Sequence, residues 1–482
     1  MAKQKSLKVN FIMNAILTMS SFIFPLITFP YVSRILMPDG MGKVNFAISV
    51  INYFSMFAQL GIPTYGIRAC AQVRDNRVKL TRTVHELLFI NLIMTIISYI
   101  GLFIAVLFVP KLHSEKTLYV ITSFTIFLTT IGIEWMYKAL EQYTYITIRS
   151  IVFKFIGLVS MFMLVHAKSD YLIYAAINVF SSAGSSVLNI LNAHKYIGLK
   201  PIGKYNVKKH LKPVLIFFSM SIATTIYTNL DTIMLGFMKS DADVGYYTAA
   251  VKIKNILVSI VTSLGAVLLP RASYYIEQGD LDQFKDLSKK AMNFVFLIAI
   301  PLMVYFTLFA KQGIIFLSGK SFIDATIPMQ LIMPTLLFIG VTNIMGIQIL
   351  VPLGYERIVL ISTIAGGIVD LIVNWILIPS LASSGASIGT LAAEFVVLVV
   401  QYFVATREVP GLFREIKYYK IFIAVVASSL ISIWTLELGF GVFITLVVSA
   451  ILFFAIYGLI LLILKEQLIT EIFYQFINKI KK

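Results

Sequence analysis

Charged residues are scarce in this sequence. Only 13% of its 482 residues are Asp, Glu, Lys or Arg, whereas 59% are hydrophobic. A soluble globular protein has about 25% charged residues. The chain is also long enough for many helices of about 20 residues, the length that crosses a bilayer. The composition therefore excludes a simple soluble domain and predicts a polytopic membrane protein.

Cysteine is almost absent, and this limits the chemistry of the chain. Cys70 is the one cysteine, which excludes an internal disulfide and a thiolate metal site. The five histidines are scattered, and no glycine-rich phosphate loop or nucleophile–base pattern occurs. We therefore predict no enzyme, no metal and no cofactor, and a structural role for Cys70.

Long polar segments are also missing. The longest loop, about 192–212, is short and basic, so it has no room for the nucleotide-sugar domain of a membrane glycosyltransferase. Polysaccharide polymerases and ligases need a sizeable outer loop, and the outer loops here are short. A polysaccharide polymerase or ligase, which is a membrane enzyme, stays open as the alternative to a protein without enzyme activity.

Continuous apolar runs fill the sequence instead. Because they do not alternate with a period of two, they predict transmembrane helices rather than a barrel. The fourteen predicted spans are 10–33, 44–66, 85–109, 118–137, 145–166, 171–191, 213–237, 245–270, 291–317, 329–353, 358–378, 385–405, 420–438 and 441–464.

Basic residues exceed acidic ones by 40 to 23. With the N-terminus inside, the inner loops and termini hold 28 of the 40, the outer loops hold 8, and four lie within spans. This bias matches the positive-inside rule, which places Lys and Arg on the cytoplasmic side. We therefore expect both termini in the cytoplasm and no nucleic-acid partner.

Two segments look like an internal repeat. Gly42 precedes an apolar run that ends near Pro63, and Gly245 begins an apolar run that ends near Pro270. The two glycines are 203 residues apart, and the two prolines are 207 residues apart. Both runs point in the same direction, so the halves would be parallel repeats of six helices, with substrate between them.

The repeat predicts the domain organisation of an all-α membrane protein with about 14 transmembrane helices. Residues 1–192 form an N-terminal lobe of helices 1–6, and 193–212 a basic cytoplasmic linker. Residues 213–406 form a C-terminal lobe of helices 7–12. Residues 407–482 add helices 13 and 14 and an amphipathic tail with apolar residues at helical spacing from Leu468 to Ile480.

Four stretches resemble the polysaccharide exporters of the MOP superfamily, in particular Wzx-type flippases. They are 30–42 (PYVSRILMPDGMG), 60–68 (LGIPTYGIR), 134–149 (EWMYKALEQYTYITIR) and 229–236 (NLDTIMLG), the last followed by VGYY at 244–247. The resemblance covers nearly the whole chain, including two additional C-terminal helices.

The resemblance implies a flippase in the bacterial cytoplasmic membrane. Such proteins move undecaprenyl-pyrophosphate-linked oligosaccharide units from the inner to the outer leaflet, for capsule, O-antigen or related polysaccharides. A lipid II flippase of the same superfamily stays open, whereas a multidrug antiporter would favour an acidic cavity. The expected partners are the lipid-linked oligosaccharide, membrane lipids, and a polymerase with its chain-length machinery. We expect a monomer.

Cations within or at the ends of spans are the candidate substrate-binding residues, because burying a charge in a membrane is costly. Lys154 lies about 13 Å into its span at about 1.5 Å per residue, where it can meet pyrophosphate or sugar. Arg149 is shallower, and Arg34 lies at the outer end of the first span. The alternatives are a salt bridge or a snorkelling side chain for Lys154, a snorkelling side chain for Arg149, and an interfacial anchor for Arg34.

Lys252 and Lys254 complete the substrate-binding candidates. They are about 200° apart around a helix and cannot share one face. Asp231 is expected at a similar depth in the preceding span, so one lysine can pair with it while the other lines the cavity.

Buried carboxylates are the candidate ion-coupling residues. Asp370 and Glu394 lie near the middle of two consecutive spans, and Asp231 is the third candidate. Hydrogen bonding to neighbouring Ser, Thr or Asn is the structural alternative. Coupling to a proton gradient, a sodium gradient or the membrane potential alone stays open.

Overall fold

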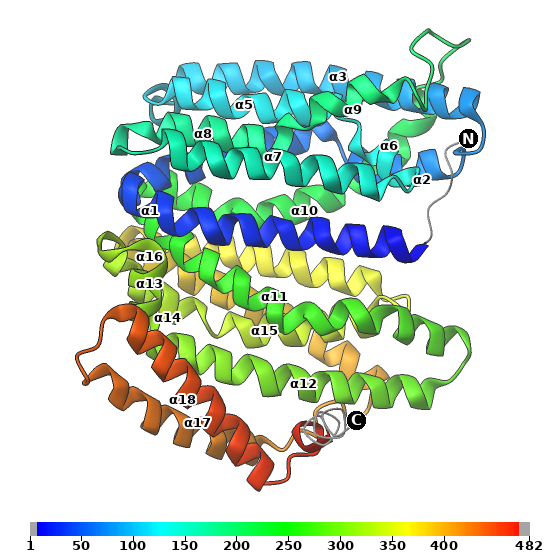
Figure 1. The fold of residues 1–482 in the computed structure, drawn as a ribbon. Coiled ribbons are helices and arrows are strands. Elements are labelled where there is room, and N and C mark those ends of the chain that lie inside the picture. The colour runs from blue at the N-terminus through cyan, green and yellow to red at the C-terminus, as the bar shows by residue number, and fades with distance from the viewer. Residues whose placement is uncertain (1–6, 472–482) are drawn as a thin grey trace. The chain divides into compact units, whose positions relative to one another are not determined.

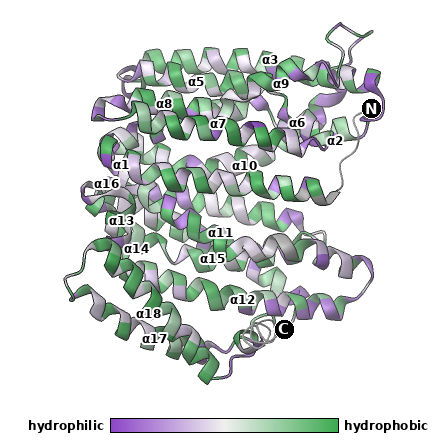
Figure 2. Ribbon diagram, in the orientation of Figure 1, coloured by the Kyte–Doolittle hydropathy of each residue, from purple (hydrophilic) through white to green (hydrophobic). Residues whose placement is uncertain are grey.

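The fold is helical, as the sequence predicts. A computed structural model of the chain describes residues 7–471, and no strand occurs among them (Figure 1). The helices are apolar along most of their length (Figure 2). Many large hydrophobic side chains are exposed, including Phe108, which is 78% exposed. Such a surface suits lipid rather than water.

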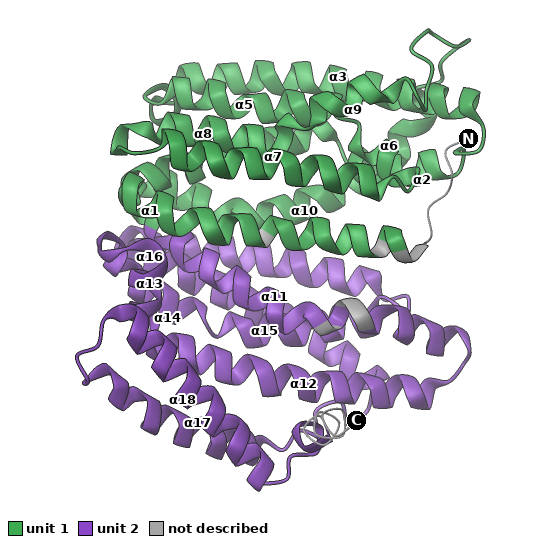
Figure 3. Ribbon diagram, viewed as in Figure 1, with its two compact units in different colours: residues 1–245 green, residues 246–482 purple. Residues whose placement is uncertain are grey.

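The chain divides into two compact units, residues 1–245 and 246–482 (Figure 3). The helices of unit 1 are α1 (Leu7–Gln59), α2 (Ile62–Ala71), α3 (Arg77–Phe108), α4 (Pro110–His113), α5 (Lys116–Ile131), α6 (Glu134–Ala139), α7 (Tyr143–Leu164), η1 (Lys168–Asp170), α8 (Tyr171–Val179), η2 (Phe180–Gly184), α9 (Ser186–Ala193) and α10 (Lys208–Met238). The next helix, α11 (Asp241–Glu277), begins in unit 1 and continues into unit 2.

Unit 2 contains the remaining helices. They are α12 (Leu281–Leu308), α13 (Ala310–Ser318), η3 (Lys320–Ala325), α14 (Thr326–Ile332), α15 (Thr335–Thr342), η4 (Asn343–Leu350), α16 (Glu356–Glu408), α17 (Tyr418–Ile433), η5 (Trp434–Leu436) and α18 (Val442–Ile463). The division into lobes at 193–212 stays a prediction.

Helix α1 organises unit 1, since it packs on α3, α5, α7 and α10. It is 53 residues long and is interrupted at Met37, where φ is 60° and ψ is 178°. Pro38 follows and favours the extended ψ of Met37, whereas it does not account for the positive φ, and Pro25 and Pro30 lie in the same helix without a break. Cys70 of α2 is buried in an apolar cluster with residues of α3 and α6 such as Leu87 and Met136.

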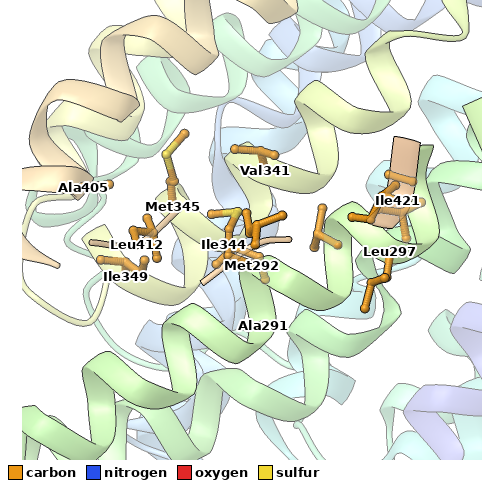
Figure 4. Close-up of a cluster of buried hydrophobic side chains, with 14 of the residues drawn as sticks. Ala291, Met292, Leu297, Val341, Ile344, Met345, Ile349, Ala405, Leu412 and Ile421 are labelled. Carbon is orange, nitrogen blue, oxygen red and sulfur yellow. The ribbon is translucent and has the colours of Figure 1, made fainter. Parts of the chain in front are cut away.

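Unit 2 has its own core and its own long interrupted helix. Helix α16 also has 53 residues, with non-helical angles at Ala382. The main core joins α12, α15, η4, α16 and α17 through side chains such as Met292, Val341, Ile349 and Ile421 (Figure 4).

Eleven helices among the described residues are long and apolar enough to cross a membrane, or twelve if the bent pair 320–332 and 335–350 forms one span. Their ends differ from the predicted spans. Helix α12 begins at Leu281, ten residues before the predicted 291, because the Asp280 side chain caps it by accepting a hydrogen bond from the Gln283 amide at 3.1 Å. Of the predicted amphipathic tail, residues 467–471 are helical, and 472–482 lie outside the described residues.

The two glycines of the predicted repeat lie at one helix contact. A Cβ atom on Gly42 would lie 1.7 Å from the backbone oxygen of Asp241, and one on Gly245 would lie 2.2 Å from that of Pro38. Each glycine therefore faces the carbonyl four residues before the other. This reciprocal approach is open only to residues without a side chain.

We expect Gly42→Ala and Gly245→Ala each to destabilise the protein by about 1–3 kcal/mol, since the added methyl group must displace backbone. Thermal unfolding in detergent would measure the loss. The matched control is Gly458→Ala in α18, where a Cβ would meet nothing within 4 Å. Equal unfolding temperatures for all three variants would contradict the close contact.

Candidate functional site

A polar pocket surrounds Lys154 in unit 1. Helix α7 carries the lysine, and its Nζ donates hydrogen bonds to the Oγ atoms of Ser20 and Ser21 on α1, both at 2.9 Å. The adjoining cavity has a volume of about 260 Å³. Its polar lining consists of Ser21, Thr28, Lys154, Asn178, Ser181 and Ser182.

Local helix geometry forms this pocket. The π-helical turn η2 lies between α8 and α9 and carries Ser181 and Ser182. Such single π-turns are frequent at functional sites. Gly157 of α7 permits the approach of η2, since a Cβ there would lie 1.8 Å from Ser181 Oγ.

The Lys154 ammonium is held by hydroxyl groups rather than by a carboxylate. Ser20 and Ser21 donate their own protons to the Leu17 carbonyl at 2.6 and 3.3 Å, so they accept from the lysine. Within residues 7–471, no carboxylate lies at ion-pair distance from Lys154. Glu134 acts on Lys154 electrostatically from beyond ion-pair distance, but it is itself paired with Lys138 and Arg149. A cation in apolar surroundings is costly without an anion in direct contact. The pocket is therefore suited to an anionic group with additional hydroxyls.

Arg149 is positioned differently. It is 5% exposed, and its Nη2 lies 2.9 Å from Glu134 Oε2 while its Nη1 donates to Ser185 Oγ at 3.1 Å. Glu134 also pairs with Lys138 at 2.9 Å. These contacts, which the sequence analysis did not predict, favour a structural role, and the substrate-binding role of Arg149 stays a prediction.

Charge removal on each side of this pair distinguishes the two roles. We expect Arg149→Gln and Glu134→Gln both to lower stability by about 2 kcal/mol, since each removes charge-assisted hydrogen bonds. Thermal unfolding and the yield of folded protein would report the loss. Defective transport by Arg149→Gln alone, at a normal unfolding temperature, would instead assign Arg149 to the substrate.

Arg34 lies just before the break in α1. Its side chain is exposed, and Nη1 donates to the Pro30 carbonyl one helical turn earlier. This contact fits an anchor at a helix end, and a role in substrate release stays a prediction.

The other candidate cations lie in α11. Lys254 is 9% exposed and Lys252 is partly buried, both in unit 2. Asp231 is 7% exposed and lies in α10 of unit 1. Their roles and the ion pair between them stay predictions.

The candidate carboxylates Asp370 and Glu394 are both buried in α16, at 2% and 7% exposure. Asn374 Nδ2 donates to Asp370 Oδ1 at 3.1 Å. A Cβ on Gly389 would lie 2.9 Å from Asp370 Oδ1, so the two arms of α16 approach closely at this carboxylate. Thr390 Oγ1, on the second arm, lies 2.9 Å from the Tyr247 hydroxyl of α11.

Some members of these clusters escaped the sequence analysis. Asn374 lies four residues after Asp370, and Thr390 four before Glu394, so helical spacing marks both as neighbours. Ser20 and Ser21 carry no such signal, because they lie more than 130 residues from Lys154.

A further polar cluster surrounds Glu86, which sequence reasoning also missed. Its fully buried carboxylate accepts from the Asn206 amide at 2.6 Å, and lies 2.7 Å from Lys209 Nζ and 2.9 Å from His210 Nε2. His210 Nδ1 in turn lies 2.8 Å from the Tyr65 hydroxyl. The cluster joins α2 and α3 to the start of α10.

Comparisons with known proteins agree with this architecture. The family model described as "Polysaccharide biosynthesis protein" matches residues 7–275, and the MatE model matches residues 216–376. A protein of Escherichia coli (strain K12) named "Putative O-antigen transporter" is 27% identical over 81% of this chain and 95% of its own length.

Two solved structures share the fold. The "Lipid II flippase MurJ, inward closed conformation" has a TM-score of 0.70 at 16% identity, over 94% of this chain and 100% of that one. An inward-facing multidrug resistance MATE family transporter of the MOP superfamily has a TM-score of 0.62 at 14% identity, over 84% and 99%. These matches support the resemblance to Wzx-type flippases of the MOP superfamily. The chain is a multi-pass membrane protein, and it belongs to the polysaccharide biosynthesis protein family.

Proposed function

We propose that this chain moves undecaprenyl-pyrophosphate-linked oligosaccharide units from the inner to the outer leaflet of the bacterial cytoplasmic membrane, by alternating access of two lobes. The observation that carries the proposal is the Lys154 pocket, where an ammonium without a carboxylate partner among the described residues lies beside hydroxyl and amide groups. A phosphate or an acidic sugar complements the ammonium, and sugar hydroxyls complement the serines. The O-antigen transporter name of the Escherichia coli relative supports a glycan substrate.

The polar groups of the pocket can offset the cost of removing water from the glycan. Sugar hydroxyls that lose water without gaining a hydrogen-bond partner cost several kcal/mol each. An anion that moves outward is helped by an inside-negative potential by about 2.3 kcal/mol per charge per 100 mV. The chain must therefore supply polar partners for the glycan more than a driving force for the charge.

The full topology is part of the proposal. At about 1.5 Å per residue, α1 and α16 with 53 residues each are about 80 Å long, whereas the hydrocarbon core is about 30 Å thick. Each is also interrupted near its middle, so we count two spans in each. Eleven candidates, the bent pair and these two additional spans make fourteen.

Two further features support the proposed arrangement. The reciprocal contact of Gly42 and Gly245 relates the two predicted repeats by an equivalent packing. With an even number of spans, both termini lie on one side, which the distribution of basic residues assigns to the cytoplasm.

Asp370 is the proposed ion-coupling residue, assisted by Glu394 and Asp231. Its burial and its Asn374 hydrogen bond support a carboxylate that binds a proton or a sodium ion. We expect transport by the wild type to respond to an imposed proton or sodium gradient, and Asp370→Asn to lose that response. If neither gradient changes the rate of wild-type transport, ion coupling is contradicted, and the membrane potential is left as the driving force.

Leaflet exposure of the lipid-linked oligosaccharide tests the function in cells. Depletion of the chain should trap the oligosaccharide in the inner leaflet, where a glycan-directed reagent added outside the membrane cannot reach it. Normal outer-leaflet exposure with polymer assembly still blocked would overturn the proposal and favour a polymerase or ligase. If lipid II accumulates in the inner leaflet instead, the substrate is the peptidoglycan precursor rather than the polysaccharide unit.

A further inference from the structure

The segment between α9 and α10 forms a groove with α3. The cavity between them has a volume of about 460 Å³, within the range of about 300–1,000 Å³ typical of ligand sites. Leu88, Phe89 and Leu92 of α3 form one wall, and Leu199, Pro201 and Val207 contribute to the other. The groove is therefore predominantly apolar.

This segment is fastened to α3, so the groove is formed in advance. The Gly198 amide donates to Thr81 Oγ1 at 3.0 Å, and Arg77 Nη2 donates to the His194 carbonyl at 2.9 Å. Near the other end, Tyr205 Oη lies 2.9 Å from His85 Nδ1. Glu86 also lines the groove, but its carboxylate is held by the Asn206 amide, Lys209 and His210.

The rim of the groove is cationic. Lys200 lies between Leu199 and Pro201 in the sequence, Lys204 precedes Tyr205, and Lys208 follows Val207. Each of these lysines is exposed and adjoins a residue that lines the groove. Three exposed lysines are thus adjacent in sequence to residues that line the apolar floor.

The groove also continues into a lipid-facing surface. Along α3 the large exposed side chains recur at helical spacing: Phe89, Leu92, Ile93, Ile96, Ile100, Phe103, Ile104 and Leu107. A stripe of this kind on a membrane helix faces acyl chains. The groove therefore lies where such a surface meets a run of lysines.

We propose that this groove binds an anionic phospholipid of the leaflet that the basic segment faces. Its acyl chain packs on Phe89, Leu92 and Leu199, and its phosphate and head group lie among Lys200, Lys204 and Lys208. Basic pockets beside membrane helices are suited to such head groups, and each nearby lysine favours an anionic surface by about fivefold. A zwitterionic lipid satisfies the apolar floor but not the rim. The site is separate from the Lys154 pocket and from the proposed flipping reaction.

Fluorescence quenching by brominated lipids tests the site directly. The probe is the full chain with Leu199→Trp, and the signal of the parent chain with its three native tryptophans is subtracted. In vesicles that contain brominated phosphatidylglycerol or brominated phosphatidylcholine, we expect the introduced tryptophan to show at least about fivefold preference for the anionic lipid when all lysines are present. High salt should reduce that preference, since it screens exposed charge.

Two lysine triples separate a local site from overall charge. Changing Lys200, Lys204 and Lys208 to alanine should bring the preference to within about twofold. The matched control changes the exposed Lys116, Lys168 and Lys320 and should leave it intact. Unchanged quenching in phosphatidylcholine would show that each variant is folded. Equal quenching by the two lipids in the probe chain, or an equal loss in both triples, would overturn the proposal.

Discussion

Replacing Lys154 with alanine is expected to lower flipping of lipid-linked oligosaccharide about tenfold to a hundredfold, without lowering the amount of folded protein. Among the described residues that line the cavity, the ammonium is the one charged group, and a charge-assisted hydrogen bond contributes about 1.5–3 kcal/mol. Its described partners are the neutral Ser20 and Ser21. Removing the ammonium therefore leaves no described carboxylate without a contacting ion-pair partner. The substitution should lower the rate of transport rather than the stability of the protein.

Three matched variants make this prediction specific. Lys154→Arg keeps the charge and should retain part of the activity, although its planar head changes the geometry. A double Ser20→Ala and Ser21→Ala variant should weaken transport less, because it removes the positioning hydroxyls but not the cation. Lys168→Ala removes an exposed lysine and should be silent. Full polymer assembly in cells that carry Lys154→Ala would return Lys154 to a structural role.

Glu86→Ala is expected to be the most destabilising single change of the carboxylates described above. The Glu86 side chain is fully buried and receives the Asn206 amide, Lys209 and His210. Removing it leaves the buried His210 imidazole and the Asn206 amide without their acceptor, at about 1–3 kcal/mol for each group that is buried. The total should reach about 3 kcal/mol, because Lys209 is partly exposed and can return to water.

Glu86→Ala should also loosen the segment before α10 locally, in addition to lowering the stability of the whole protein. Without Glu86 the segment before α10 loses the contacts of Asn206, Lys209 and His210 to α3, so trypsin should cleave after Lys204 or Lys208 faster than in the wild type. Glu86→Gln keeps an acceptor and should lie between the two. Glu277→Ala removes an exposed carboxylate and serves as the control. Wild-type unfolding temperature and proteolysis in Glu86→Ala would show that the cluster holds nothing in place.

Features carried by local sequence were predictable. The apolar runs identified the helices because the absence of water forces backbone hydrogen bonding within each span. Lys154 stood out because a cation in an apolar run is rare.

Features carried by contacts between distant residues were not predictable. Nothing near Lys154 identifies Ser20 and Ser21 as its partners. Glu86 looks like an ordinary charge near the start of a span until residues 206–210 lie beside it. Arg149 shows the intermediate case, since its partner Glu134 lies in the same sequence stretch, but only the structure brings the two together.

Transport by the purified full chain in sealed vesicles tests the central claim most directly. A fluorescent undecaprenyl-pyrophosphate-linked oligosaccharide in both leaflets would be bleached from outside by a membrane-impermeant reductant. The account predicts that wild-type vesicles lose nearly all fluorescence and that empty vesicles lose only the outer-leaflet share, whereas Lys154→Ala vesicles lose the inner-leaflet share about tenfold to a hundredfold more slowly than the wild type. Wild-type vesicles that behave like empty ones, or that bleach a labelled phospholipid equally well, would contradict it.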